Sequence, residues 1–131
     1  MKKSLLMLVI MTLALLILVD AGFAQTKPTV LGTWIGFAVV GDGNRVDITL
    51  VIEKGAAEYT GKISDSTGTV PETSLKNIVF KDNKLTFEFD MTEGTESMLI
   101  KIDLTLENET LKGAWFDPDG NSDIVELTLK K

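Results

Sequence analysis

The sequence predicts an all-β fold, an eight-stranded antiparallel up-and-down meander closed into a barrel, and three observations lead to this fold class. Apolar and polar residues alternate with period two, turn-forming residues separate the alternating stretches at short intervals, and no segment after residue 24 repeats its apolar residues every 3.6 positions. Short connections favour antiparallel neighbours, and a meander removes its exposed edges most simply by closing. A half-open barrel or a two-sheet sandwich is the alternative.

The alternation is clearest in segment 45–53, where Val46, Ile48, Leu50 and Ile52 fall on one face and polar residues on the other. The same pattern recurs in KLTFEFDM and MLIKIDLTL, and clusters of Gly, Asp, Asn, Ser and Thr lie between the segments. The strands are expected at 31–40, 45–53, 58–65, 75–81, 84–91, 97–106, 111–117 and 123–130.

Residues 1–24 have the pattern of a helical signal peptide, with Lys2 and Lys3 ahead of an apolar run over 5–19 and small residues just before Gln25. The alternative is a membrane anchor, but the run is shorter than the ~20 apolar residues that a spanning helix needs. The pattern predicts cleavage before Gln25 and export to the periplasm or the extracellular space, with no stable membrane anchor after cleavage.

Residues 25–131 are then expected to form a single domain, because roughly a hundred residues suffice for one core. The net charge of −6 disfavours nucleic acid as a partner. Cysteine and histidine are both missing, so no disulfide forms, and the commonest general base and metal ligand are lacking. Carboxylate pairs such as Glu88 and Asp90 alternate with phenylalanines and are expected on the solvated face. The sequence therefore predicts a protein that is not an enzyme and needs no cofactor.

Gly-x-Trp occurs twice, as Gly32-Thr33-Trp34 and Gly113-Ala114-Trp115. Residues two apart in a strand share a face, so each glycine lies beside its tryptophan. Two interpretations stay open: both indoles fill the core, or they form an aromatic wall of a ligand pocket. Gly61 and Gly113 fall at equivalent points of two similar hairpins, which indicates sharp coiling, a bulge, or a large side chain over bare backbone.

GTWIG at the start of the first strand, the aromatic-x-Gly hairpin, KLTFEF and LKGAW together resemble the calycin superfamily, lipocalins especially. GTW is also similar to the first strand of fatty-acid-binding proteins. Over most of 31–130 the sequence more closely resembles small lipocalin-like domains of bacterial exported proteins. This resemblance implies a barrel more strongly than lipid carriage, because lipocalins stack an arginine of the last strand on the motif tryptophan, and the only arginine here is Arg45.

The predicted function is that of an exported, non-enzymatic binding module for a small apolar or amphipathic molecule. Six candidate ligand-binding residues face the predicted interior: Trp34, Trp115, Phe87, Phe89, Ile100 and Ile102. Because eight strands share so short a chain, we expect a mostly filled interior with at most a small pocket, and the polar end of any guest at the rim. The alternative is a filled-core envelope or secreted interaction module that contacts protein or glycan through loops or a sheet edge.

The segment DPDGNSD places four oxygen-bearing side chains in alternation: Asp117, Asp119, Asn121 and Asp123. This resembles the opening of a calcium-binding loop, but Ser122 replaces the glycine of the sixth position and Thr128 the glutamate of the twelfth. We therefore expect an Asp-Gly turn and no metal site, with these four residues as the weak candidates.

Overall fold

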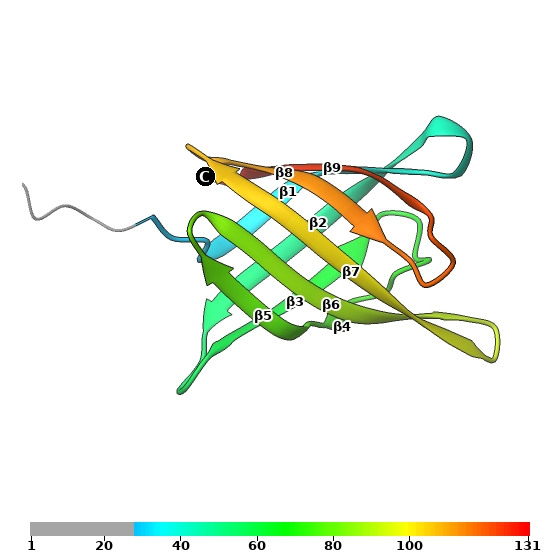
Figure 1. Ribbon diagram of the computed structural model, residues 1–131, viewed down its shortest axis with the longest axis horizontal. Coiled ribbons are helices and arrows are strands. Elements are labelled where there is room, and N and C mark those ends of the chain that lie inside the picture. The colour runs from blue at the N-terminus through cyan, green and yellow to red at the C-terminus, as the bar shows by residue number, and fades with distance from the viewer. Residues whose placement is uncertain (1–27) are drawn as a thin grey trace, which may run out of the picture.

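The protein is described here by a computed structural model that covers residues 28–131, which form one antiparallel sheet curled into a nearly closed barrel (Figure 1). The strands are β1 (Gly32–Val40), β2 (Asn44–Lys54), β3 (Tyr59–Asp65), β4 (Thr73–Ser74), β5 (Lys76–Lys81), β6 (Lys84–Glu93), β7 (Glu96–Glu107), β8 (Thr110–Phe116) and β9 (Ser122–Leu129). A single 3₁₀ turn, η1 (Gly41–Gly43), joins β1 to β2. The predicted signal peptide, residues 1–24, and its cleavage point lie outside the described residues.

The strands follow the chain around the sheet in the order β4-β3-β2-β1-β9-β8-β7-β6-β5. Every neighbouring pair is antiparallel, and the first long strand closes onto the last through the pairing of β1 with β9, from Trp34 opposite Leu129 to Ala38 opposite Val125. The all-β class and an antiparallel sheet of barrel-like form are therefore confirmed. The strand count was wrong by one, because the two-residue strand β4 forms within the connection that was expected to be a loop.

The barrel is incomplete along one seam, between β3 and β5. Strand β4 pairs with β3 only at Lys62 and Ile63, and the N–H of Leu75, between β4 and β5, donates to the Gly61 carbonyl oxygen at 2.9 Å. Asn77 has φ of 52° and interrupts the register of β5 with β6, and such a bulge twists an edge away from a partner. The structure therefore lies between the closed and half-open barrels and is a single sheet, not a sandwich.

The predicted alternation sets which residues face the barrel interior. On β6, Leu85, Phe87 and Phe89 are buried while Lys84 and Asp90 are exposed. The two-residue turn Asp82-Asn83 joins β5 to β6 with both residues at positive φ, as a tight hairpin turn requires. Period two and short turns together account for the inward apolar surface.

Gly36 in β1 and Gly113 in β8 lie where the backbone of a neighbouring strand approaches closely. A Cβ atom on Gly36 would lie 1.9 Å from the Glu126 carbonyl oxygen, and one on Gly113 would lie 1.9 Å from the Asp103 carbonyl oxygen. Both glycines belong to the inward rows, so a side chain there would enter the backbone of the neighbouring strand. Each tryptophan lies two residues from such a close approach, Trp34 before Gly36 and Trp115 after Gly113.

The two ends of the barrel differ. At one end, Trp34 and Val30 are almost completely buried, and leucines of β6, β7, β8 and β9 fill the interior around them. At the other end lie the connections β1–β2, β3–β4, β6–β7 and β8–β9, on the right of Figure 1. Within residues 28–131, no helix has the length and hydrophobicity that a membrane crossing requires.

Candidate binding cavity

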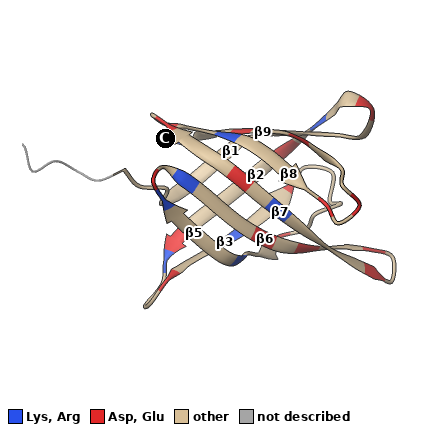
Figure 2. Ribbon diagram, in the orientation of Figure 1, with Lys and Arg blue, Asp and Glu red and all other residues tan. Residues whose placement is uncertain are grey.

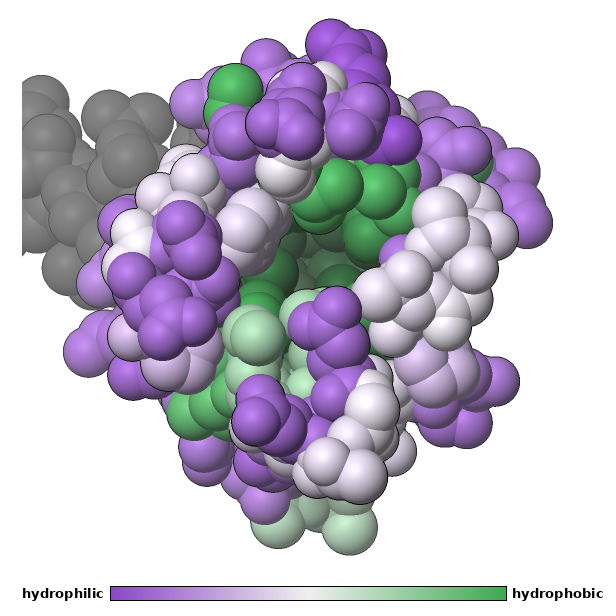
Figure 3. All heavy atoms as spheres, turned by 90° about the vertical axis from the view of Figure 1, so that its right-hand side faces the viewer, coloured by the Kyte–Doolittle hydropathy of each residue, from purple (hydrophilic) through white to green (hydrophobic). Residues whose placement is uncertain are grey.

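The end of the barrel that carries those four connections opens into an apolar cavity of about 300 Å³. Its wall combines inward residues of six strands, β1, β2, β6, β7, β8 and β9, with Ile63 of β3 and the loop after β3. Figure 3 shows this end as a hollow with hydrophobic surface inside and a mostly hydrophilic rim. A concave apolar site with a few polar groups at its margin has the form of a small-molecule pocket.

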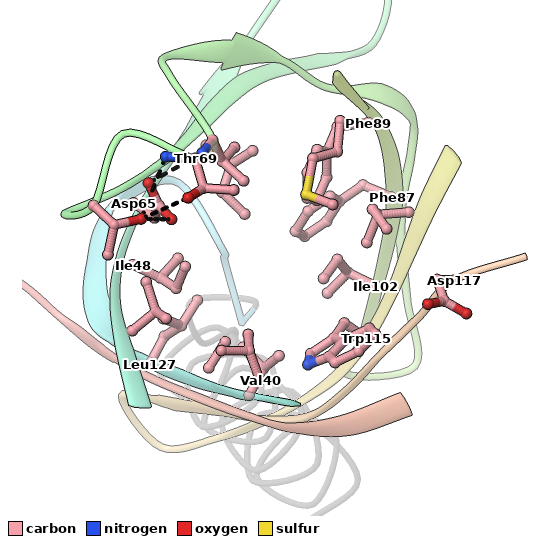
Figure 4. Close-up of a pocket in the computed structure, with 18 of the residues that line it drawn as sticks. Val40, Ile48, Asp65, Thr69, Phe87, Phe89, Ile102, Trp115, Asp117 and Leu127 are labelled. Carbon is pink, nitrogen blue, oxygen red and sulfur yellow. Dashed lines mark hydrogen bonds between the residues drawn. The ribbon is translucent and has the colours of Figure 1, made fainter. Parts of the chain in front are cut away.

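Five of the six candidate residues line this cavity: Phe87, Phe89, Ile100, Ile102 and Trp115. Figure 4 shows Phe87, Phe89 and Ile102 along one side of the hollow, near Trp115. They meet because β6, β7 and β8 are adjacent, with Phe87 opposite Ile102 and Ile102 opposite Trp115. The structure thus brings these five side chains to one wall.

Trp34 does not belong to the cavity. It is 1% exposed, and its indole N–H donates to the Val30 carbonyl oxygen at 2.9 Å, within the filled end of the barrel. Val30 just before β1 is itself fully buried, so the indole and the incoming chain close that end together. Trp34 is therefore a core residue.

Trp115, unlike Trp34, lies in the wall of the cavity. Its side chain is half-buried and forms part of the cavity wall, and its indole N–H donates to the Val39 carbonyl oxygen at 2.7 Å. This bond satisfies the polar edge of the ring and leaves its apolar surface toward the hollow. The interpretation that both indoles fill the core is therefore wrong for Trp115.

The expected mostly filled interior holds for only one half of the barrel. At the filled end the inward side chains are large, as with Trp34 and the leucines, whereas near the opening they include Ala38, Val40, Val46 and Val125. These small side chains leave part of the interior near the opening unfilled. Sequence patterning marks these positions as inward but does not say which of them share one end.

The rim on the β3 side is a hydrogen-bonded polar loop, where the sequence had predicted only a turn. Asp65 Oδ1 accepts hydrogen bonds from the backbone N–H groups of Gly68 (2.8 Å) and Val70 (3.1 Å). Its Oδ2 accepts one from the Thr67 hydroxyl at 2.8 Å, and Asp65, Thr67 and Thr69 all line the cavity (Figure 4). The signal was DSTGT, an Asp that bonds the backbone just ahead of it. Met91 and Met98, two adaptable side chains of the wall, were also missed.

On the opposite side of the rim, Asp117 organises the β8–β9 connection. Its Oδ1 accepts from the N–H groups of Asp119 (3.0 Å) and Asn121 (2.9 Å), and its Oδ2 accepts from the Asn121 side-chain amide at 2.9 Å. The amide of Asn121, assisted by the backbone N–H groups, holds the pKa of Asp117 below its ordinary value of 3.8. Asp117 lines the cavity margin and stays ionised at neutral pH.

The four metal candidates form a turn in this structure. Asp117 and Asn121 bond to each other, Asp119 contributes its backbone N–H, and Asp123 accepts from the Ile124 N–H at 2.8 Å. Among residues 28–131, no group of three or more His, Cys, Asp or Glu side chains is arranged to hold a metal ion. The oxygen atoms of Asp117 are engaged by the loop itself.

Comparison of the chain with protein-family models, with curated proteins and with solved structures gave no match. The resemblance to lipocalin-like domains therefore stays a prediction from the sequence motifs.

Proposed function

We propose that the protein is an exported, non-enzymatic binding module that holds one small apolar or amphipathic molecule in the open end of its barrel. The observation that carries this proposal is the cavity of about 300 Å³, with Phe87, Phe89, Ile100, Ile102 and Trp115 in its wall. Burial of an apolar guest against these side chains supplies the driving force, about 25 cal/mol for each Å² removed from water. The polar end of the guest lies at the rim.

The volume limits the size of the guest. An apolar cavity of about 150 Å³ holds one benzene ring, so about 300 Å³ suits roughly a dozen non-hydrogen atoms. A ten-carbon alkyl chain with a small head, or a compact ring system, is of this size. Longer lipids would extend out of the opening.

The non-enzymatic part of the proposal follows from the polar groups at the cavity. Asp65 and Asp117 are each hydrogen-bonded to their own loop and lie on opposite sides of the rim, so they do not act as a pair on one bond (Figure 4). Export to the periplasm or the extracellular space is proposed on the pattern of residues 1–24 alone.

We also propose that the barrel is lipocalin-like. Trp34 of the Gly-x-Trp motif starts β1 and closes the filled end, and β1 pairs with the last strand. The chain departs from the lipocalin pattern at the arginine, because Arg45 stacks on Phe37, with its guanidinium carbon 4.2 Å from the ring centroid, and not on Trp34.

Filling the cavity from its own wall tests the function. Ala38 faces the hollow from β1, whereas Ala114 lies between Gly113 and Trp115 and faces outward on β8. Ala38→Phe occupies about half of the space and is expected to weaken the binding of decanol at least tenfold, measured by intrinsic fluorescence and calorimetry. Ala114→Phe, the same change on the outer face, should leave binding unchanged. If wild-type protein binds no apolar probe, or if both variants bind as well as wild type, the cavity is not a ligand site.

The alternative function, an interaction module, is supported by one observation at the seam between β3 and β5. Strand β5 ends the sheet, so its outer edge has no strand partner within residues 28–131, and an extended peptide could pair there. The bulge at Asn77 and the flanking Lys76 and Lys81 are features that protect edges from pairing. If the variant Val79→Pro in β5 no longer bound a peptide partner but still bound decanol, this alternative would be favoured.

A further inference from the structure

The cavity rim carries charge of one sign only. Of the twenty lining residues, the ionisable ones are Asp65 and Asp117, and both are acidic. They lie on opposite sides of the opening, Asp65 as the last residue of β3 and Asp117 just after β8 (Figure 4). Neither lysine nor arginine contributes to the lining, so the head of a guest meets carboxylates and threonine hydroxyls.

The connections around the opening extend this acidic character. Asp42 lies in the β1–β2 turn, Glu93 and Glu96 flank the β6–β7 turn, and Asp119 and Asp123 lie in or next to the β8–β9 connection. Figure 2 shows the acidic residues at the tips of the hairpins at this end. The basic residue nearest these turns in sequence is Arg45, and its guanidinium group is stacked on the outward ring of Phe37.

Fixed negative charge around a low-dielectric hollow raises the local concentration of cations and repels anions. The loops keep the two rim carboxylates in place, because Asp65 accepts three hydrogen bonds and Asp117 accepts three from their own segments. Aromatic faces inside the hollow, Phe87, Phe89 and Trp115, also attract a cation more than an anion.

From these observations we propose that the cavity selects a monocationic amphiphile, an amine or quaternary ammonium head on an apolar tail of about ten carbons, and excludes carboxylate amphiphiles such as fatty acids. This inference rests on the proposed function of the cavity and adds the charge of its ligand. The tail occupies the apolar hollow, and the head lies at the rim between Asp65 and Asp117. The recognition is opposite in sign to that of carriers that hold a fatty-acid carboxylate with arginine.

The first test compares three probes of the same tail length: decylammonium, decanol and decanoate, each below its micelle concentration. Binding is measured by intrinsic fluorescence at low and at high salt. We expect decylammonium to bind at least about tenfold more tightly than decanoate at low ionic strength, decanol to lie between them, and the difference to shrink in about 1 M salt. Equal affinities for the three probes, or tighter binding of decanoate, would overturn the charge preference and leave the proposed function standing. If no probe binds, both proposals fail.

Matched variants then test whether the charge at the rim determines the order of affinities. Thr69→Lys adds a cation to the rim, and Thr128→Lys adds the same charge on the exposed face of β9. Thr69→Lys should bring decanoate binding to at least the level of decylammonium, while Thr128→Lys should keep the wild-type order.

Asp117→Asn should weaken the binding of decylammonium about threefold or more, and Asp119→Asn, in the same connection but outside the lining, should have a smaller effect. If both lysine variants change the order of affinities equally, the net charge of the protein and not the rim sets the preference, and the inference is wrong.

Discussion

The indole N–H of Trp115 on β8 donates to the carbonyl oxygen of Val39 on β1 at 2.7 Å, although β9 lies between these two strands in the sheet. The bond lies just beyond the point where the pairing of β1 with β9 ends, at Ala38 and Val125. It fixes the ring of Trp115 as part of the cavity wall. Trp34 bonds only to Val30 nearby in sequence, at the filled end.

These two positions predict different costs for the same truncation. Trp34→Ala should lower the free energy of unfolding by about 3–5 kcal/mol, because a fully buried indole leaves a large void. Trp115→Ala should cost about 1–3 kcal/mol, because that ring is half-buried and borders a hollow already present. Denaturant unfolding of both variants measures the difference. Equal costs would mean that the two indoles share one environment.

Gly36 and Gly113 should tolerate no side chain. Alanine at either position places a methyl carbon 1.9 Å from a backbone oxygen of the next strand, so a strand must shift, and we expect a loss of about 2–4 kcal/mol. Gly41 is the matched control, since a Cβ there meets no heavy atom within 4 Å. Gly41→Ala should change stability by less than about 0.5 kcal/mol. Equal melting temperatures for the three alanine variants would contradict the close backbone approach at Gly36 and Gly113.

The carboxyl of Asp117 should titrate below its ordinary value of 3.8, because the Asn121 amide and nearby backbone N–H groups stabilise the ionised form. A lowered pKa in the folded state means that its contribution to stability is present above 3.8 and is lost as the pH falls through the lowered value. Carbon-13 NMR of the side-chain carboxyl reports this titration directly. Asn121→Ala should raise the pKa toward the ordinary value. A wild-type titration at or above 3.8 would show that the turn does not hold this carboxylate.

Calcium should leave the melting temperature nearly unchanged, because the Asp117 oxygens are bonded within the DPDGNSD turn. Thermal unfolding with millimolar calcium and with a chelator makes the comparison. A rise in melting temperature that depends on calcium and disappears in Asp119→Ala would contradict this expectation and establish a metal site in the turn.

The strands and their inward faces were predictable because period two and turn residues are local signals. Phe87 and Phe89 alternate with Thr86 and Glu88, and Asp82-Asn83 dictates a tight hairpin whatever the rest of the chain does. Strand β4 was missed because two residues carry no periodicity, and it forms only where β3 offers a partner at Lys62 and Ile63.

Local sequence signals could not show that Trp34 would lie in the core and Trp115 in the cavity wall. Trp34 and Trp115 stand in the same Gly-x-Trp context, yet Trp34 lies opposite Leu50 and Leu129, whereas Trp115 lies opposite Ile102 and Asp123. Register and strand order, set by pairing between distant segments, decide which indole reaches the open end. The cavity was underestimated for the same reason.

The two tryptophans, one at each end of the barrel, can report separately on whether a ligand binds at the open end. Trp34→Phe leaves Trp115 as the sole tryptophan, and Trp115→Phe leaves Trp34. Each is titrated with decanol that carries bromine on the carbon next to the hydroxyl-bearing carbon, so that the quencher lies near the rim. We expect strong, saturable quenching in Trp34→Phe, where the fluorescence comes from the cavity wall, and weak quenching in Trp115→Phe, whose indole lies at the filled end. Absence of saturable quenching in Trp34→Phe, or equal quenching in the two variants, would contradict a binding site at the open end.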